Sequence, residues 1–160
     1  MTDVSPKRLA EKLKIEGKKN LEFFRALTPD QWEQQVYSEG ASWTVRQVFA
    51  HIAEAEKSIP RLITTILEGS PGVPEDFDLD GYNERKVNQL GDISPDELFE
   101  RFTAHRTATV AMVNKMTPAD LEKTGRHPFL GVAPVLEMLK LMVVHINLHQ
   151  RDIRRALTVE

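Results

Sequence analysis

The chain has 160 residues, of which 41% are hydrophobic and 28% charged, so it can bury an ordinary globular core, and we expect one domain over residues 1–160. It contains no cysteine, which excludes disulfide bonds and thiolate metal sites and fits the cytoplasm. The net charge of −3 argues against nucleic acid as a partner. The apolar runs are too short for a membrane span, and the polar first ten residues argue against a signal peptide.

The charges are unevenly distributed along the chain. Residues 6–27 contain seven Lys or Arg against three Asp or Glu, whereas residues 68–100 contain ten Asp or Glu against two Lys or Arg. We interpret these segments as solvated faces that attract each other within the fold or across a dimer, with a dedicated ligand patch as the alternative.

The first helix is predicted over residues 6–27. Ser5 is a typical N-cap, and Pro6 fits the first helical position, where its missing N–H is not needed. Apolar residues then recur with the period of an α-helix. A Thr-Pro pair at residues 28–29 repeats the start signal and predicts a short helical piece.

The second long helix is predicted over residues 45–67. Thr44 and Gln47 form a capping box, in which each side chain bonds the free backbone N–H of the other residue. Pro60 lies inside the helix, and because the apolar period resumes directly after it, we expect a kink rather than an end. Trp43 is interpreted as a hydrophobic contact at the helix start, with a substrate platform as the alternative.

Two further long helices follow. An acidic loop over residues 69–93, with one helical stretch at 82–90, precedes a helix at 95–116. A short helical piece at 118–123 and a loop lead to the last helix at 134–157. No segment has a convincing strand pattern, so the prediction is an all-α four-helix bundle with short extra helices in the connections. Because the connections are long, we do not assume a simple up-down topology.

Two histidines lie on the inner face of the last helix. His145 and His149 are four residues apart, and His149 occupies a position of the apolar stripe. This spacing lets both imidazoles reach one metal ion at about 2.0–2.1 Å. Short motifs also arise by chance, so two structural or partly exposed histidines are the alternative. Buried ring nitrogens need partners, and a metal ion would supply them.

His51 lies near the start of the second long helix, beside its apolar stripe. A lone histidine there is typical of a core residue that bonds a neighbour. The pair His145 and His149 lies towards the end of the last helix, however, so antiparallel packing would bring all three to one level. Three imidazole ligands with an open coordination position are typical of catalytic zinc sites, and His105 is a further candidate for the fourth ligand.

Four segments that span nearly the whole chain are informative together: SWTVRQVFAHIAEAE (residues 42–56), DGYN (80–83), HPFLG (127–131) and HINLHQRDI (145–153). In this order and spacing they resemble the DinB-like (YfiT-type) metal-binding four-helix bundles. The resemblance implies the bundle, a metal on His51, His145 and His149, a homodimer, and a bacterial, cytoplasmic setting. Some members of this family are thiol S-transferases that use bacillithiol or mycothiol, and others are hydrolases or isomerases. At residues 147–148 the Asn-Leu pair departs from the acidic or aromatic residues frequent in relatives.

Charged residues near the histidines are the remaining candidates. Glu54 and Asp152 each follow a histidine by three residues, so either can orient a ligand imidazole or act as a catalytic base, with a solvated carboxylate as the alternative. The cluster Arg151, Arg154 and Arg155 complements the dipole at the end of the last helix and is also a candidate for binding an anionic thiol cofactor. His127 is interpreted as a loop residue.

The leading hypothesis is a metal-dependent enzyme acting on a small-molecule substrate, either a thiol S-transferase or a hydrolase. Zinc suits three imidazole ligands best, and nickel, copper or iron also suit them. The alternative is a non-catalytic bundle that a metal stabilises or that binds a ligand. An open metal position inside a pocket would favour the enzyme, whereas a fourth protein ligand would favour the alternative.

Overall fold

The computed structural model describes residues 4–158. In it, the residues predicted to cap the starts of helices do so. The hydroxyls of Ser5, Thr28, Thr44, Ser94 and Thr117 each accept a backbone N–H of the helix that follows. The helices are α1 (Pro6–Arg25), α2 (Pro29–Trp32), α3 (Val45–Leu67), α4 (Leu79–Leu90), α5 (Pro95–Asn114), α6 (Pro118–Glu122) and α7 (Val135–Thr158). Helix α3 continues through Pro60 instead of ending there.

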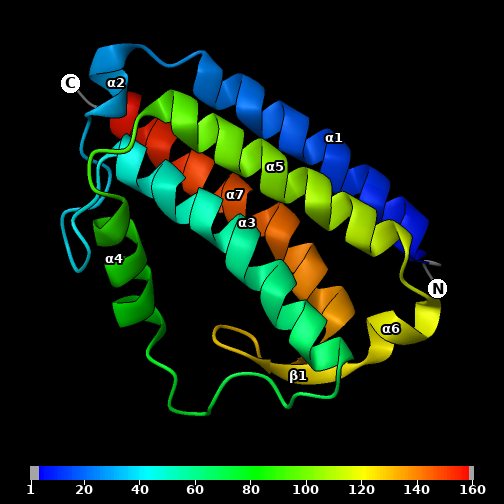
Figure 1. Cartoon of the computed structure of the whole chain (residues 1–160). Helices are drawn as coiled ribbons and strands as arrows, with labels where there is room; N and C mark the ends of the chain where they lie inside the picture. Colours follow the sequence, from blue (N-terminus) through cyan, green and yellow to red (C-terminus); the bar gives the residue numbers. More distant parts are fainter. Residues whose placement is uncertain (1–3, 159–160) are drawn as a thin grey trace.

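The four long helices form a bundle with an unusual order of directions (Figure 1). Helix α1 packs against α5 and α7, and α3 packs against the same two helices, so α1 and α3 occupy opposite corners. Helices α1 and α7 run in one direction, and α3 and α5 run in the other. The long link that contains α4 lets α5 run parallel to α3. Helices α3 and α7 are antiparallel, which is the arrangement that the histidine positions required.

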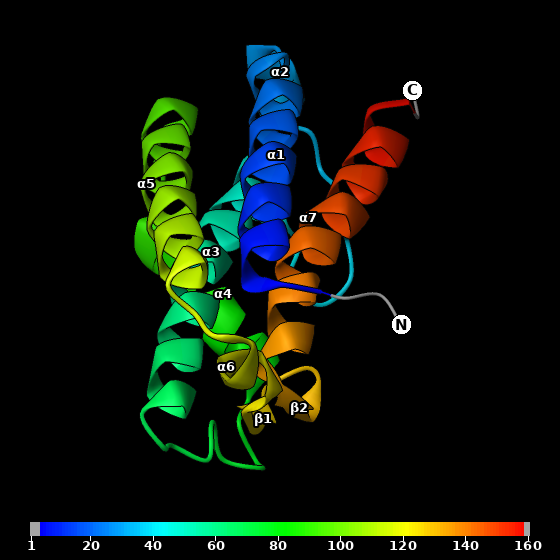
Figure 2. The ribbon, with the colours of Figure 1, turned by 90° about the vertical axis from the view of Figure 1, so that its right-hand side faces the viewer.

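A two-stranded antiparallel hairpin corrects the prediction that the chain has no strand. Strands β1 (Thr124–His127) and β2 (Gly131–Pro134) pair at one end of the bundle, beside α6 and the start of α7 (Figure 2). Each strand has only four residues and includes glycine or proline, so no alternation of apolar residues marked it. Paired backbone groups, and not side-chain pattern, define this element.

The link between α3 and α4 is attached to this hairpin. The N–H of Arg126 donates to Pro71 O (2.8 Å), and Arg126 O accepts from the N–H of Val73 (3.0 Å). Gly72 between them has a φ of 99°, and a Cβ there would lie 2.3 Å from backbone atoms of Arg126. Only glycine fits this close approach.

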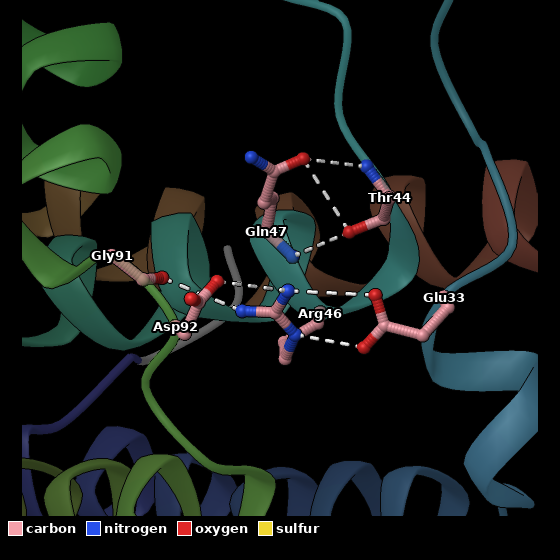
Figure 3. A network of polar contacts seen from close by, with 6 residues as sticks. All are labelled: Glu33, Thr44, Arg46, Gln47, Gly91 and Asp92. Atoms are coloured by element: carbon pink, nitrogen blue, oxygen red, sulfur yellow. Dashed lines mark hydrogen bonds and ion pairs between the residues drawn. The ribbon is translucent and has the colours of Figure 1, made fainter.

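The start of α3 is held by a polar network (Figure 3). Thr44 and Gln47 form the predicted capping box. The Arg46 guanidinium donates to the Glu33 carboxylate after α2 (3.0 Å) and lies 3.8 Å from Asp92 before α5. These contacts fix the first turn of α3, and His51 follows two turns after the cap.

Two apolar clusters fill the bundle. One contains stacked aromatic rings, among them Phe24 and Phe49 with centroids 4.1 Å apart, and the other lies towards the hairpin end. Between α3 and α5, the carboxylate of Glu56 accepts from Arg106 Nε (2.7 Å) in a buried ion pair. None of the helices within residues 4–158 combines the length and hydropathy that a membrane span needs.

Candidate metal centre

Histidine side chains from the second turn of α3 and from the middle of α7 converge between these two helices. The Nε2 atoms of His51 and His145 are 3.1 Å apart, and those of His145 and His149 are 2.9 Å apart. The ring planes of each pair are inclined at 82° or 83°, with centroids 4.5 to 5.1 Å apart. Three nitrogen atoms from rings of different orientation therefore face one point, which is the arrangement that a small cation requires.

All three imidazoles are held in the neutral form by burial. Burial lowers the pKa of His51 well below its usual value, and the two neighbouring histidines lower it further. Burial also lowers the pKa of His145 to about 3 and that of His149 to about 4. At pH 7 the rings therefore carry no positive charge, and metal binding requires neutral imidazole.

Tyr37 determines which nitrogen of His149 carries the proton. Its hydroxyl donates to Asp152 Oδ2 (2.6 Å) and lies 3.0 Å from His149 Nδ1. Because that hydroxyl proton goes to Asp152, the Tyr37 oxygen accepts from Nδ1–H of His149, and Nε2 keeps its lone pair for the centre. Burial and Asp152 raise the pKa of Tyr37, so the phenol stays protonated. Trp43 covers the His51 ring, with centroids 5.1 Å apart.

A cavity of about 570 Å³ opens on the three histidines. Helices α3 and α7 form two of its walls, and α4, the link before it and the hairpin loop form the others. Apolar side chains such as Leu62, Phe77 and Leu148 contribute much of the lining. Its volume is in the range of pockets that enclose small molecules.

The two predicted carboxylates lie at this cavity, whereas the predicted arginines do not line it. Glu54 and Asp152 both belong to the lining. Arg151 lies 3.6 Å from Asp152 Oδ1, and Arg154 stacks on the Phe23 ring. Arg155 is exposed in the last turn of α7. Binding of a thiol by these arginines stays a prediction.

For His105 and His127, the structure differs from what the sequence predicted. His105 borders a separate, smaller cavity beside Glu56, and within residues 4–158 the group that could hold a metal contains only His51, His145 and His149. His127 is not a loop residue, because it is the last residue of β1. Its side chain is buried and lines the large cavity. Backbone pairing turns its side chain inward.

Tyr37 was missed by sequence analysis. It lies between α2 and α3, without a helical period or a motif, and only the tertiary structure brings it to His149. For His127 the available signal was the HPFLG segment, in which the histidine precedes the turn whose backbone N–H groups it accepts.

Comparisons with known proteins agree with this fold. The sequence profile of the DinB superfamily matches residues 12–153. No curated protein matches the sequence.

Solved structures are similar over nearly the whole chain. YfiT from Bacillus subtilis, described as a probable metal-dependent hydrolase with an unusual four-helix bundle topology, has a TM-score of 0.76 at 18% identity, over 98% of this chain and 89% of that one. A mycothiol-dependent maleylpyruvate isomerase has a TM-score of 0.74 at 13% identity, over 96% of this chain and 63% of that one. The four-helix bundle protein TT2238 has a TM-score of 0.57 at 19% identity, over 97% of this chain and 100% of that one. At these identities the similarity establishes the fold.

Proposed function

Since the chain belongs to the DinB superfamily, we propose that it is a metal-dependent enzyme that acts on a small molecule, with a divalent metal bound by His51, His145 and His149. The observation that carries this proposal is the convergence of three neutral Nε2 atoms at separations of 2.9 and 3.1 Å. The solved structures of YfiT, described as a probable metal-dependent hydrolase, and of a mycothiol-dependent maleylpyruvate isomerase share this fold and support the proposal.

The donor set fits a divalent ion better than it fits a self-contained hydrogen-bond network. His149 presents a lone pair at Nε2, because Tyr37 takes its Nδ1–H. His145 Nε2 lies within hydrogen-bond distance of both other Nε2 atoms, and one proton cannot satisfy three nitrogens. One cation accepts all three lone pairs. Zinc is the first choice, with nickel or iron next.

The protein supplies binding, orientation and proton acceptors. When bound, a divalent ion on three imidazoles supplies a Lewis acid that lowers the pKa of a coordinated thiol or water. Tyr37 and Asp152 hold the His149 ring in place. The carboxylates of Glu54 and Asp152 face the cavity and are placed to accept the proton that a thiol or a water loses. Thiol S-transfer and hydrolysis are therefore the two reaction classes that we propose.

The cavity favours an enzyme over the non-catalytic alternative. A purely structural metal site is closed by a fourth protein ligand, and residues 4–158 provide no fourth His, Cys, Asp or Glu at this point. The centre instead borders a space large enough for a small molecule. A thiol cofactor on Arg151, Arg154 and Arg155, a homodimer and a cytoplasmic setting stay predictions of the family resemblance.

Metal content of protein purified without an affinity tag tests the proposal. We expect about one divalent ion per chain, and its loss in His145→Ala and His149→Ala. His105→Ala, which removes a histidine from the other cavity, is the matched control and should keep the metal. Full metal content in His149→Ala would refute the site.

A second measurement distinguishes the reaction classes. Conjugation of a small thiol to monochlorobimane, compared with hydrolysis of a p-nitrophenyl ester, is measured with the metal-loaded protein and with His149→Ala. Activity of neither kind above the uncatalysed rate would favour the non-catalytic bundle.

A further inference from the structure

His127 is held in a single tautomer by the turn that follows it. Its Nδ1 accepts the backbone N–H groups of Phe129 (3.0 Å) and Leu130 (3.3 Å). A nitrogen that accepts two N–H groups carries no proton, so in the neutral ring the proton is on Nε2. Burial lowers the pKa of His127, which keeps the ring neutral at pH 7. The fold therefore fixes an N–H donor at the far side of this ring.

This donor belongs to a residue of the cavity lining and has no hydrogen-bond partner within residues 4–158. His127 lines the same cavity as the three-histidine cluster. Within residues 4–158, Nε2 of His127 makes no hydrogen bond. It is also not shielded from solvent, because the only fully buried side-chain N or O atom without a partner in this range is Nδ2 of Asn20. His127 Nε2–H is therefore open to the cavity, where an acceptor atom of a ligand can reach it.

The charge around the cavity indicates the sign of the ligand. Lys57, Arg61 and Lys86 contribute to its lining, and none of them forms an ion pair with another residue of the range 4–158. The opposing carboxylates are Glu54 and Asp152, and Asp152 already accepts from Tyr37 and lies near Arg151. Among the lining residues these three cations outnumber the two carboxylates, which favours an anionic ligand in the cavity.

We infer that the cavity binds an organic carboxylate with an apolar body, and that His127 Nε2–H donates a hydrogen bond to an oxygen of this ligand beside the three-histidine cluster. Leu62, Phe77 and Leu148 cover the apolar body. An organic carboxylate would be the substrate class of the proposed enzyme, and to that extent the inference rests on the proposed function. Binding of the carboxylate does not require the metal, because neither His127 nor the cationic residues are metal ligands.

Two substitutions separate the two ring nitrogens of His127. In His127→Asn, Oδ1 replaces Nδ1 as the acceptor for the turn, and the donor at the Nε2 position is lost. In His127→Gln, the side-chain amide places an N–H near the former Nε2, and the acceptor for the turn is lost. A donor role predicts that Asn weakens binding and Gln retains it, whereas a structural role predicts that Gln weakens binding at least as much as Asn does.

The probe is benzoate, with benzyl alcohol as its uncharged analogue, and binding is measured by NMR titration of the protein as purified and after chelation. We expect benzoate to bind wild type more tightly than benzyl alcohol does. A hydrogen bond to a charged group should make benzoate about tenfold weaker in His127→Asn, with an unchanged melting temperature. His127→Gln should bind benzoate within about threefold of wild type and melt at a lower temperature.

Each contrary result overturns the inference in a recognisable way. Absence of benzoate binding to wild type removes the proposed ligand class. Equal weakening in both variants assigns His127 a structural role only. If benzoate binding is lost on chelation and is the same in both variants as in wild type, benzoate is a ligand of the metal. If no metal is found but the Asn and Gln variants still differ as expected, the metal proposal fails and this inference stands.

Discussion

Tyr37 links the candidate ligand His149 to Asp152, 112 and 115 residues away along the chain. Second-sphere partners of this kind orient a ligand imidazole and fix its tautomer. Asp152 was a candidate to orient a ligand imidazole or to act as a catalytic base, and its contact with His149 is indirect, through the Tyr37 hydroxyl. Through its hydroxyl oxygen, Tyr37 thus connects the irregular segment between α2 and α3 to the candidate metal centre.

Removing this hydroxyl should weaken metal binding without unfolding the protein. We expect Tyr37→Phe to lower the affinity for zinc about 10- to 100-fold, because the His149 ring loses its Nδ1 acceptor. Competition with a fluorescent chelator measures the affinity. Tyr82→Phe is the control, since Tyr82 also lines the cavity and its hydroxyl has no hydrogen-bond partner within residues 4–158. Equal affinities of Tyr37→Phe and wild type would contradict the orienting role.

The metal-free protein should lose stability as the pH falls. In the unfolded chain His145 and His149 take up protons below about pH 6.5, whereas in the folded state their pKa values are about 3 and about 4. The unfolded state therefore binds more protons between pH 6.5 and about 4, and the free energy of unfolding decreases as pH falls through this window. Each histidine contributes a slope of up to about 1.4 kcal/mol per pH unit.

Urea unfolding of chelated protein between pH 7.5 and 5 measures this slope. His145→Gln/His149→Gln is the comparison and should show a flatter profile. The prediction is wrong if the wild-type free energy of unfolding stays constant over this range.

At the scale of elements, a buried polar contact joins α1, α3 and α5. Arg106 of α5 donates to Glu56 of α3 and, through Nη1, to the carbonyl of Leu13 of α1 (2.7 Å). Gly17 makes room for this guanidinium, because a Cβ there would lie 3.0 Å from Arg106 Cγ. A parallel contact between α1 and α7 joins Asn20 to Gln150, the residue after His149. These pairs fix how the helices are rotated about their axes, and so where the histidines point.

Breaking the buried ion pair should be costly. Glu56→Gln leaves the buried Arg106 charge without its counterion, and we expect a loss of about 3 to 5 kcal/mol in the free energy of unfolding. The control is Glu97→Gln, which removes an exposed pair with Arg101 and should cost at most about 1 kcal/mol. Urea titration compares the two variants. A loss below about 1 kcal/mol in Glu56→Gln would show that the pair contributes little.

At the scale of the whole molecule, the metal would join two antiparallel helices that no short connection holds together. A ligand that binds only the folded state stabilises it by RT ln(1 + [L]/Kd), which is about 2.7 kcal/mol at a free concentration of 100 Kd. Chelation at pH 7.5 should therefore lower the melting temperature by several degrees, and zinc should restore it. The same treatment should leave His149→Ala unchanged. An unchanged wild-type melting temperature would mean that the metal does not stabilise the bundle.

The four long helices, the cap at Thr44 and the pair His145 and His149 could all be predicted from the sequence. Each depends on residues close together in the chain, within one capping box or one helical turn, so the local pattern contains the information. Even the convergence of His51 with that pair needed only one further assumption, antiparallel packing of two helices. The family resemblance supplied the same set.

The tertiary structure alone decided the contacts of Tyr37 and His127, the hairpin, and the position of the arginines outside the cavity lining. A hydroxyl in an irregular segment has no periodicity, and its partner is chosen by packing more than a hundred residues away. The four-residue strands are defined by backbone hydrogen bonds, which residues of many types can make, so their side chains form no pattern that predicts them. Local physics thus determined which helices form and which face of each is apolar, whereas the cavity and its donors depend on contacts between segments distant in the sequence.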